Sequence, residues 1–204
     1  QGALVYALAG FVLPPGTPTP TNTWNPLTPT YTFTPTLSPT PTPPTVFAEC
    51  ASSIVIDGNL NDATWQEGTW QSVTRVVVGT PPSPISAQFK VRWDANALYV
   101  GVDVTDSALY NDSGTQWYND DSVEVYLDMN NNHSTTYQAD DFQFSLRYND
   151  ATLREQNNKL STSTAAYATK TGGWTAEFRL TWSDLGVIPA ANARYGFDVG
   201  VNYD

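Results

Sequence analysis

The chain has 204 residues and a formal net charge of −11 at pH 7, with 20 Asp and Glu residues against nine Lys and Arg residues. This length accommodates one ordinary domain with an appendage. The shortage of basic side chains argues against nucleic acids and anionic membrane surfaces as partners, because both require a positively charged footprint. A composition poor in charge and rich in Trp, Tyr, Thr, Asn and Asp is typical of extracellular β-proteins, so we expect a secreted or extracellular location.

The first segment, residues 3–13, is apolar throughout. It is too short to cross a bilayer, which needs about 20 apolar residues in a helix. Three interpretations stay open: the end of a signal sequence, part of a membrane anchor, or the last strand of a preceding domain. We therefore expect residues 1–13 to be the apolar remnant of an upstream segment, and we expect no membrane insertion by the folded domain itself.

Residues 14–49 have a different composition, because most of the prolines fall here, next to Thr or Ser. Proline removes backbone donors and fixes φ, so we expect neither helix nor ladder but a disordered, extended linker of about 3.1 Å per residue. It would tether the domain to a cell surface or to covalently linked neighbouring domains. The alternative is disorder without a role. Cys50 follows, either as a partly covered side chain or as one half of a bridge to a cysteine outside this sequence.

From residue 53 onward, apolar and polar residues alternate in six segments that are separated by Asp, Asn and Gly. The six predicted strands are 85–93, 98–104, 122–128, 141–148, 174–180 and 195–203. Period-two alternation indicates antiparallel sheets with one dry face. We therefore predict an all-β fold, an antiparallel β-sandwich of jelly-roll or immunoglobulin-like type, over residues 50–204. Two helical turns are expected, at 62–66 and 183–185.

Catalytic patterns are scarce. His133 is the only histidine and lies in an Asn-rich loop, without a nucleophile-elbow sequence elsewhere, so we interpret it as an exposed loop residue. Glycine-rich phosphate loops and metalloprotease patterns are absent from the sequence. Carboxylates are too abundant for any two of them to identify a glycosidase pair. We expect a protein that is not an enzyme.

Nine acidic residues between positions 103 and 141 occur without any Lys or Arg among them; they are Asp103, Asp106, Asp112, Asp120, Asp121, Glu124, Asp128, Asp140 and Asp141. Carboxylates repel one another when folding brings their loops together, and a hard cation with oxygen ligands removes that cost. We therefore expect structural calcium, although the EF-hand spacing is absent. The alternative is a solvated acidic loop region.

A polar row is expected where the strands at 122–128 and 141–148 pair, and its members are Glu124, Gln143, Ser145 and Arg147. Lys90 or Arg92 could join it from a neighbouring strand. A carboxylate, an amide and a guanidinium together suit the vicinal hydroxyls of a sugar. Trp117 lies in the polar loop just before this row, and an indole ring can stack on the C–H face of a pyranose. The alternative for Trp117 is a lid packed over the end of the sandwich. Of the other tryptophans, we expect Trp93 and Trp174 in the core, and Trp65 and Trp182 at the edges.

These segments, taken in order, resemble the family 9 carbohydrate-binding modules and, more broadly, the DOMON-like sandwiches. The matching segments are Ile56-Asp57-Gly58 with Asp62 and Trp65; Val91-Arg92-Trp93-Asp94 through Leu98-Tyr99-Val100 to Asp106; Trp117-Tyr118-Asn119-Asp120-Asp121-Ser122-Val123-Glu124 to Asp128; Asp140-Asp141-Phe142-Gln143-Phe144; Gly173-Trp174 to Trp182; and Gly196-Phe197-Asp198 to Asn202. Each segment alone is a weak signal, whereas the ordered set is specific.

The resemblance implies a non-catalytic module that binds a polysaccharide or oligosaccharide of xylan or cellulose type and is appended to a secreted glycoside hydrolase or a surface protein. In the family, two tryptophans sandwich a terminal sugar above a polar strand face. Trp117 matches the first tryptophan, and Glu124 and Gln143 match polar sugar contacts. Asp106 and Asp121 match positions in the calcium loops.

Two departures from the family pattern stand out. The family often carries an arginine where this chain has Ser145, and Arg147 points to the same face. The family also continues beyond the position of Asp204 with a loop that bears the second tryptophan and with a closing strand. We therefore expect a C-terminally truncated module with an unpaired strand edge.

Three other functions remain open from the residues alone. The domain could serve display or adhesion on a cell surface without binding sugar. Some DOMON-like domains bind haem, for which Met129, Lys170 or His133 would be the axial ligands. A catalytic glycosidase is the third alternative, although no acid with a raised pKa is identifiable from the sequence.

Overall fold

The computed structural model describes residues 2–6, 19–23, 30–34, 45–81 and 85–204. They belong to two units, one made of residues 1–7 and 46–204, the other of residues 8–45. Within the smaller unit, β2 (Thr19–Thr23) pairs with β3 (Thr30–Thr34), and Pro20 stands opposite Phe33. The expectation that the proline-rich segment forms no ladder is therefore wrong for these two stretches. Threonine favours strands, and both strands of a two-stranded ladder are edge strands, where proline is tolerated. The rest of the predicted linker up to residue 44 lies outside the described residues.

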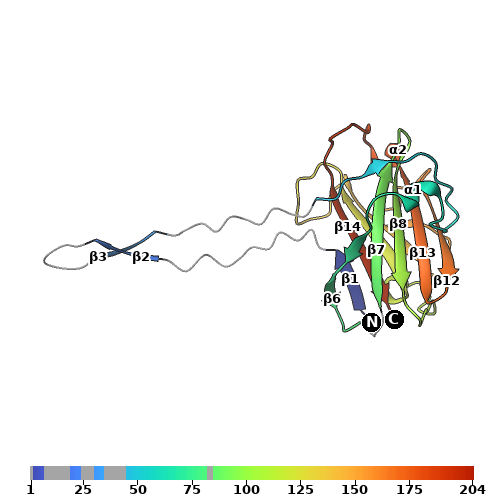
Figure 1. The fold of residues 1–204 in the computed structure, drawn as a ribbon, viewed down its shortest axis with the longest axis horizontal. Coiled ribbons are helices and arrows are strands. Elements are labelled where there is room, and N and C mark those ends of the chain that lie inside the picture. Colours follow the sequence, from blue (N-terminus) through green and yellow to red (C-terminus); the bar gives the residue numbers. More distant parts are fainter. Residues whose placement is uncertain (1, 7–18, 24–29, 35–44, 82–84) are drawn as a thin grey trace. The chain divides into compact units, whose positions relative to one another are not determined.

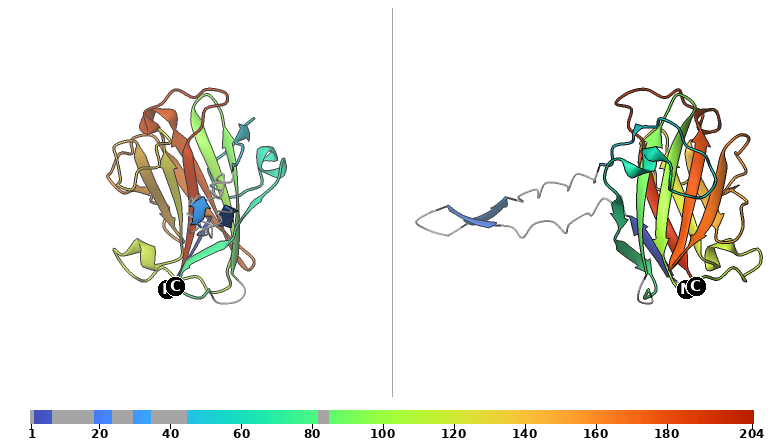
Figure 2. Two further views of the ribbon diagram at one scale, coloured as in Figure 1. Left: turned by 90° about the vertical axis from the view of Figure 1, so that its left-hand side faces the viewer. Right: turned by 45° about the vertical axis from the view of Figure 1, so that its right-hand side comes forward.

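The larger unit is a sandwich of two sheets, which confirms the predicted all-β fold (Figures 1 and 2). The first sheet has the strand order β11-β10-β9-β14-β1-β6, and its strands are β1 (Gly2–Tyr6), β6 (Arg75–Val78), β9 (Ser122–Asp128), β10 (Asp141–Arg147), β11 (Arg154–Glu155) and β14 (Gly196–Tyr203). The second sheet has the order β12-β13-β8-β7-β4, and β5 also pairs with β7. Its strands are β4 (Glu49–Cys50), β5 (Gln71–Val73), β7 (Ser86–Trp93), β8 (Ala97–Thr105), β12 (Thr164–Lys170) and β13 (Gly173–Thr181). Neighbouring strands are antiparallel except β4 and β7, which are parallel.

All six strands predicted from alternation are present, as β7, β8, β9, β10, β13 and β14. The two predicted helical turns are α1 (Ala63–Gln66) and α2 (Trp182–Leu185). α2 starts at Thr181, whose side-chain oxygen accepts a hydrogen bond from the Asp184 amide, and ends at Gly186 in the left-handed conformation. Among the described residues, no helix is long and apolar enough to cross a membrane.

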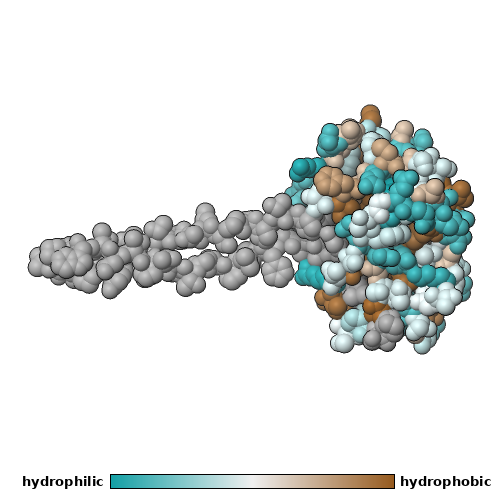
Figure 3. Space-filling model, viewed as in Figure 1, coloured by the Kyte–Doolittle hydropathy of each residue, from teal (hydrophilic) through white to brown (hydrophobic). Residues whose placement is uncertain are grey.

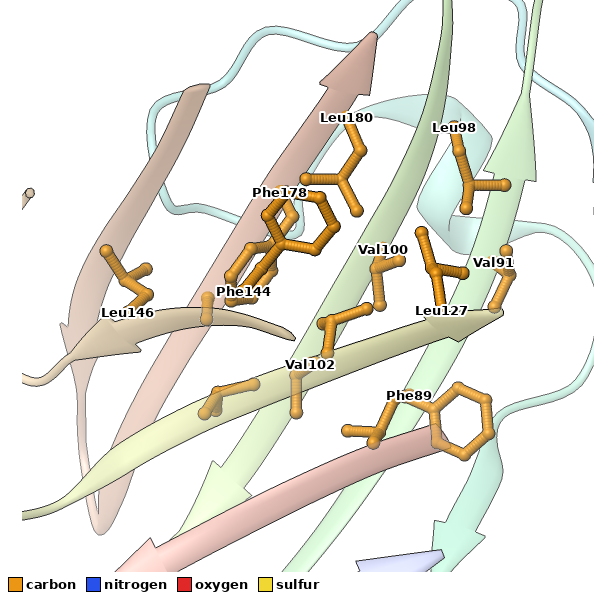
Figure 4. Close-up of a cluster of buried hydrophobic side chains, with 14 of the residues drawn as sticks. Phe89, Val91, Leu98, Val100, Val102, Leu127, Phe144, Leu146, Phe178 and Leu180 are labelled. Carbon is orange, nitrogen blue, oxygen red and sulfur yellow. The ribbon is translucent and has the colours of Figure 1, made fainter. Parts of the chain in front are cut away.

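The core fills the space between the two sheets. Figure 4 shows side chains of the second sheet, such as Phe89 and Phe178, pointing toward Leu127 and Phe144 of the first. These side chains are at most 4% exposed. Burial of each such side chain contributes about 1.5–3 kcal/mol to folding, so the alternation that buries them also fixes the strand register.

The tryptophans follow the expectations with two exceptions. Trp174 is fully buried in the main core, and Trp182 is 6% exposed in α2. Trp65 is fully buried too, but in a separate cluster with Ala97 and Tyr99 rather than at an edge. Trp93 is only partly buried, at the end of β7. Cys50 is free and exposed, rather than covered, because β4 lies at the edge of the second sheet.

β1 is an element that the sequence patterns did not predict. Residues 2–6, expected as the remnant of an upstream segment, pair with β14 from Gly2 opposite Tyr203 to Tyr6 opposite Val199. On its other side β1 pairs with β6. Because β14 pairs with β9 as well, the expected unpaired edge at β14 does not occur. Residues 7–13 lie outside the described residues.

A segment that we call the strap, residues 51–70, crosses the outer face of the second sheet and contains α1. Trp65 is its anchor, and its indole Nε1 donates to Glu177 of β13 at 2.7 Å. Glu177 also accepts from the backbone amides of Asp57 and Gly58, at 3.0 and 2.8 Å. Gly101 makes room for the ring, because a Cβ there would lie 3.1 Å from two indole carbons of Trp65.

The tight approach of the strap explains Gly58 in the Ile56-Asp57-Gly58 segment. Its φ is +87°, and a Cβ at this position would lie 2.1 Å from the backbone of Tyr167.

On the side of the molecule shown in Figure 3, hydrophilic and intermediate residues prevail and apolar ones are scattered. The outer face of the second sheet is therefore closed by the strap rather than left as an apolar surface.

The hydrogen bonds of Glu177 predict that even the conservative substitution Glu177→Gln lowers the free energy of unfolding substantially. Glu177→Gln replaces one carboxylate oxygen with an NH₂ group, which leaves buried donors of the strap facing another donor. We expect a loss of about 2–3 kcal/mol in the free energy of unfolding, measured by urea denaturation. Glu67→Gln, at an exposed position of the same strap, is the control and should change stability by less than about 0.5 kcal/mol. Equal stability of the two variants would show that Glu177 does not anchor the strap.

Candidate functional site

The outer face of the first sheet carries a row of polar side chains, which we call the polar face. β9 supplies Ser122, Glu124 and Tyr126 from the positions between its core residues. The register sets Ser145 of β10 opposite Glu124 and Gln143 opposite Tyr126. On the other side of β9, Asp198 of β14 stands opposite Tyr126 and Asn202 opposite Ser122. The members of the polar face are Ser122, Glu124, Tyr126, Gln143, Ser145, Arg147, Asp198 and Asn202.

Glu124 lies at the centre of the polar face and is only 6% exposed. Its carboxylate accepts hydrogen bonds from the Tyr126 hydroxyl and from Gln143 Nε2, the latter at 3.3 Å. Burial raises the pKa of Glu124, while hydrogen bonds from Tyr126, Gln143 and Asn202 act to lower it. These contacts hold the acceptor and the amide in fixed orientations, with the Gln143 carbonyl oxygen as a further acceptor.

Trp117 begins the short helix η1 (Trp117–Asn119) in the connection between β8 and β9. It is partly exposed, and its ring meets that of Tyr118 edge to face, with the centroids 5.6 Å apart. A hollow of about 300 Å³ opens beside the indole ring, lined by Trp117, Gln143, Ser145, Arg154, Glu155, Gln156 and Asn158. Trp117 therefore forms a wall of this hollow and is not a lid buried against the core.

Arg147 fixes the loop that carries Trp117. Its Nη1 donates to the Gly114 carbonyl at 2.7 Å and to Asp120 Oδ2 at 2.8 Å, and its Nη2 pairs with Asp150 at 3.0 Å. Asp120 is fully buried and also accepts from the amides of Asp112 and Ser113. Burial alone would raise the pKa of Asp120, but the hydrogen bonds from Arg147 and Ser113 lower it. Arg147 thus holds the Trp117 loop through Nη1, while Nη2 is fixed by Asp150 in the turn after β10.

Two buried polar atoms of the polar face have no hydrogen-bond partner, Ser145 Oγ and Arg147 Nε. Ser145 is 1% exposed, and its residue lines the hollow beside Trp117. A buried polar group without a partner costs about 1–3 kcal/mol, so such atoms are favoured positions for a polar ligand group.

Of the residues predicted from the sequence, the structure brings Trp117, Gln143 and Ser145 together around one hollow. Glu124 joins them through its bond to Gln143, and Arg147 faces the same side. The expectation that Lys90 or Arg92 could join the row is wrong. Both extend from β7 of the second sheet under the strap, where Lys90 Nζ donates to the carbonyls of Trp65 and Glu67 and Arg92 Nε to that of Thr64.

Residues from the connection after β10 complete the hollow and were not predicted; they are Arg154, Glu155, Gln156 and Asn158. β11 has only two residues, too few for an alternation signal. Tyr126, Asp198 and Asn202 were visible as outward positions of their strands, but nothing in the sequence set them beside Glu124.

Six acidic residues form two groups of three: Asp112 with Asp120 and Asp204, and Asp128 with Asp140 and Asp141. Within each group, one carboxylate oxygen from each residue lies within 4.8 Å of those from the other two. In the second group, the buried atoms Asp128 Oδ1 and Asp140 Oδ2 have no hydrogen-bond partner. A carboxylate set with orphaned oxygens fits a hard cation such as calcium. Asp106 and Asp121 belong to neither group.

Asp106 and Asp121 instead hold backbone amides. Asp106 Oδ1 accepts from the amide of Ala108 at 2.9 Å, and Asp121 Oδ2 accepts from that of Tyr110. Burial raises the pKa of Asp121 to about 7, and the nearby negative charges of Asp106 and Asp204 add to the effect. Asp121 is thus close enough to the first acidic group for the charge of Asp204 to act on it.

The proposed haem ligands lie in unrelated surroundings. Met129 is 6% exposed within the core, and Lys170 pairs with Asp103. His133 is exposed in its loop, as expected, and its ring nitrogen lies 3.0 Å from Asn131 Oδ1. The structure therefore gives no support to a haem site built from these three residues.

Comparison with known proteins gives a consistent result. Residues 56–204 match the family model described as carbohydrate family 9 binding domain-like. The chain is 32% identical over 152 residues to an endo-1,4-beta-xylanase A of Thermotoga neapolitana, and 33% identical over 149 residues to the exoglucanase XynX of Acetivibrio thermocellus. Each match covers 72% of this chain but only 14% and 13% of the respective relative.

Two solved structures of a family 9 carbohydrate-binding module from Caldicellulosiruptor kristjanssonii share the fold. The one in complex with cellotriose has a TM-score of 0.67 and 29% identity, covering 78% of this chain and 76% of that one. The one in complex with glucose has a TM-score of 0.65 and 25% identity, covering 77% and 84%.

The surroundings of Asp198 predict a pH dependence of stability. Burial raises the pKa of Asp198 to about 7, although the Val199 amide and the charge of Arg75 act to lower it. Because this pKa lies above the unfolded value of about 3.9, the stabilising contribution is complete below pH ~4 and is lost as the pH rises through ~7. We expect the melting temperature to fall between pH 5 and 8, and Asp198→Asn to flatten this slope.

Asp184→Asn is the matched control for the pH experiment. Burial alone would raise the pKa of Asp184, but hydrogen bonds from Ser161, Thr162 and Ser163 hold it below its usual value, so it does not titrate between pH 5 and 8. This variant should keep the wild-type slope. A wild-type slope in Asp198→Asn as well would contradict the assignment, whereas a residual slope from Asp121 is expected.

Proposed function

The chain belongs to the family 9 carbohydrate-binding modules, and from this premise we propose that its polar face and the neighbouring Trp117 together bind a polysaccharide or oligosaccharide. The sugar would stack on the indole ring of Trp117. The module itself is non-catalytic. The observation that carries the proposal is the partly exposed indole beside a hollow walled by Gln143 and Ser145. An aromatic plate beside fixed donors and acceptors is the arrangement that a hydroxylated ring requires.

Each group of the site has a role in this proposal. The indole of Trp117 offers a flat apolar surface to the C–H face of a pyranose. Gln143 presents a carbonyl oxygen and an amide, and the unpartnered Ser145 Oγ both donates and accepts. Glu124 and Arg147 orient Gln143 and the Trp117 loop. The preformed shape keeps the entropic cost of binding low.

For the ligand we propose β-linked plant polysaccharides of the cellulose and xylan type. The support is that the structural neighbours were solved with cellotriose and glucose and that the relatives are xylanases and a glucanase. The chain spans about one seventh of the length of the curated relatives that it matches. The module would therefore hold a covalently linked hydrolase on its substrate outside the cell, and the negative charge is compatible with uncharged glycans.

We also propose calcium at the second acidic group, Asp128 with Asp140 and Asp141. The orphaned Oδ atoms of Asp128 and Asp140 support this assignment, because oxygen ligands from an irregular loop are the ones that calcium accepts. For Asp106 and Asp121 we propose an indirect role beside the first group, since both already order loop amides.

Trp117→Ala tests the sugar site. We expect affinity for cellotriose or xylotriose to fall at least about tenfold, equivalent to ~1.4 kcal/mol of lost stacking, in isothermal titration calorimetry. Trp70→Ala removes an indole near the second sheet, where Lys90 lies over its ring, and should bind as the wild type does. Unchanged affinity in Trp117→Ala would remove the basis of the proposal, and no glycan binding by the wild-type chain would favour a display module.

Chelation tests the calcium site. A bound ion at 100 times its dissociation constant adds about 2.7 kcal/mol, which for a domain of this size corresponds to a melting temperature higher by about 5–10 °C. We expect a chelator to lower the melting temperature by that amount and added calcium to restore it. Asp140→Asn should reduce the response, whereas Asp57→Asn in the strap should not. A chelator effect no larger than that of salt alone would refute the site.

A further inference from the structure

β1 lies in the first sheet between β14 and β6, and we call this position the seat of β1. On one side, β14 pairs with β9 over seven residue pairs, from Gly196 opposite Asp128 to Asn202 opposite Ser122. On the other side, β6 follows β5 after one residue, and β5 is paired with β7 in the second sheet, from Gln71 opposite Phe89 to Val73 opposite Ala87. β14 therefore belongs to the sheet without β1, whereas β6 is connected to the sandwich through β5 and, among the described strands, pairs with β1 alone.

A side-chain contact spans the seat as well. The Tyr203 hydroxyl of β14 donates to the Val78 carbonyl of β6 at 3.4 Å. Between these two strands, β1 forms ladders on both sides, with Ala3 opposite Asn202 of β14 and opposite Val78 of β6. A strand that pairs on both edges makes the backbone hydrogen bonds of an inner strand, which gives the seat affinity for an extended peptide of suitable register.

β1 is far in sequence from the rest of its sheet. Residues 7–45, which include the separate unit 8–45, connect it to the remainder of the sandwich. A connection of about 40 residues can reach at most ~130 Å, well beyond the dimensions of a domain of this size. The connection is therefore long enough for the strand to reach the seat of a neighbouring copy as well as its own.

We propose that the seat between β14 and β6 accepts residues 2–6 of a second copy of this chain, so that copies are linked by strand exchange. The exchanged strand makes the same ladder bonds as in the single chain, so the balance between the two arrangements depends on concentration. An intramolecular strand competes at an effective concentration in the mM range, and linked copies become abundant when the chain concentration approaches that range. For a polysaccharide-binding module, linkage would multiply the sites that act on one polymer.

Single-cysteine chains test the exchange in the full-length protein. All variants carry Cys50→Ser, since Cys50 is exposed and free. One chain carries Ala3→Cys, and the other carries Asn202→Cys or Val78→Cys at the two positions opposite residue 3. The pair is unfolded together in urea, refolded at ~1 mM or at ~1 µM, and oxidised mildly. A strand from one copy seated in the other holds the two cysteines directly opposite each other, within disulfide distance, whereas random collision brings them together only briefly.

We expect a disulfide-linked heterodimer on a non-reducing gel, at least about fivefold more abundant after refolding at ~1 mM than at ~1 µM. The background from random collision is measured by mixing Ala3→Cys with Thr164→Cys, which lies exposed on β12 of the second sheet. A chain with both Ala3→Cys and Val78→Cys should close within itself at ~1 µM, which verifies the geometry. The proposal is overturned if this double variant closes while mixed chains give no more than the background, and equally if the double variant does not close, since β1 is then not seated.

Discussion

Along β9, successive side chains point alternately into the core and out to the polar face, and the rest of the structure depends on this alternation. Val123 and Val125 are fully buried between the sheets, while Glu124 and Tyr126 of the same strand form the centre of the site. A slip of one residue would turn the valines outward and place Glu124 in the apolar core without its hydrogen-bond partners, at a cost that no local contact could offset. The register that stabilises the fold is therefore the register that assembles the polar face.

Charged side chains from the sheets hold the Trp117 loop and the strap in fixed conformations. Arg147, at the end of β10, holds the connection that carries Trp117 through Gly114 and Asp120. Glu177 does the same for the strap on the opposite face. In both places a charged side chain from a rigid strand satisfies groups of an irregular segment, which would otherwise be left unpaired and mobile. The indole ring thus has a defined position although it belongs to a loop.

The strands with clear alternation, both helical turns and the group of Trp117, Gln143 and Ser145 could be predicted from the sequence, because period-two patterns specify which side chains share a face. The patterns could not predict β12, which is rich in Ala and Thr and only partly buried. They could not predict β1 either, whose partners β14 and β6 are both far away in the sequence. Lys90 and Arg92 show a further limit. Alternation indicates that a side chain leaves the core but not which sheet it belongs to or what covers it.

Burial of charged residues of both signs leaves the electric field of the module negative. Three of its nine basic residues, Lys90, Arg92 and Arg147, are at most 9% exposed, and their donors are directed at carbonyls and carboxylates inside the protein. Six acidic residues are buried to a similar degree, namely Asp106, Asp120, Asp121, Glu124, Glu155 and Glu177, so 14 acidic and six basic residues remain outside the interior and the surface keeps the negative sign of the composition. Polymers that carry uronic acids would be repelled as they approach at low ionic strength, whereas neutral chains would approach freely. Electrostatic repulsion would thus select neutral over acidic polysaccharides before any contact with the module is made.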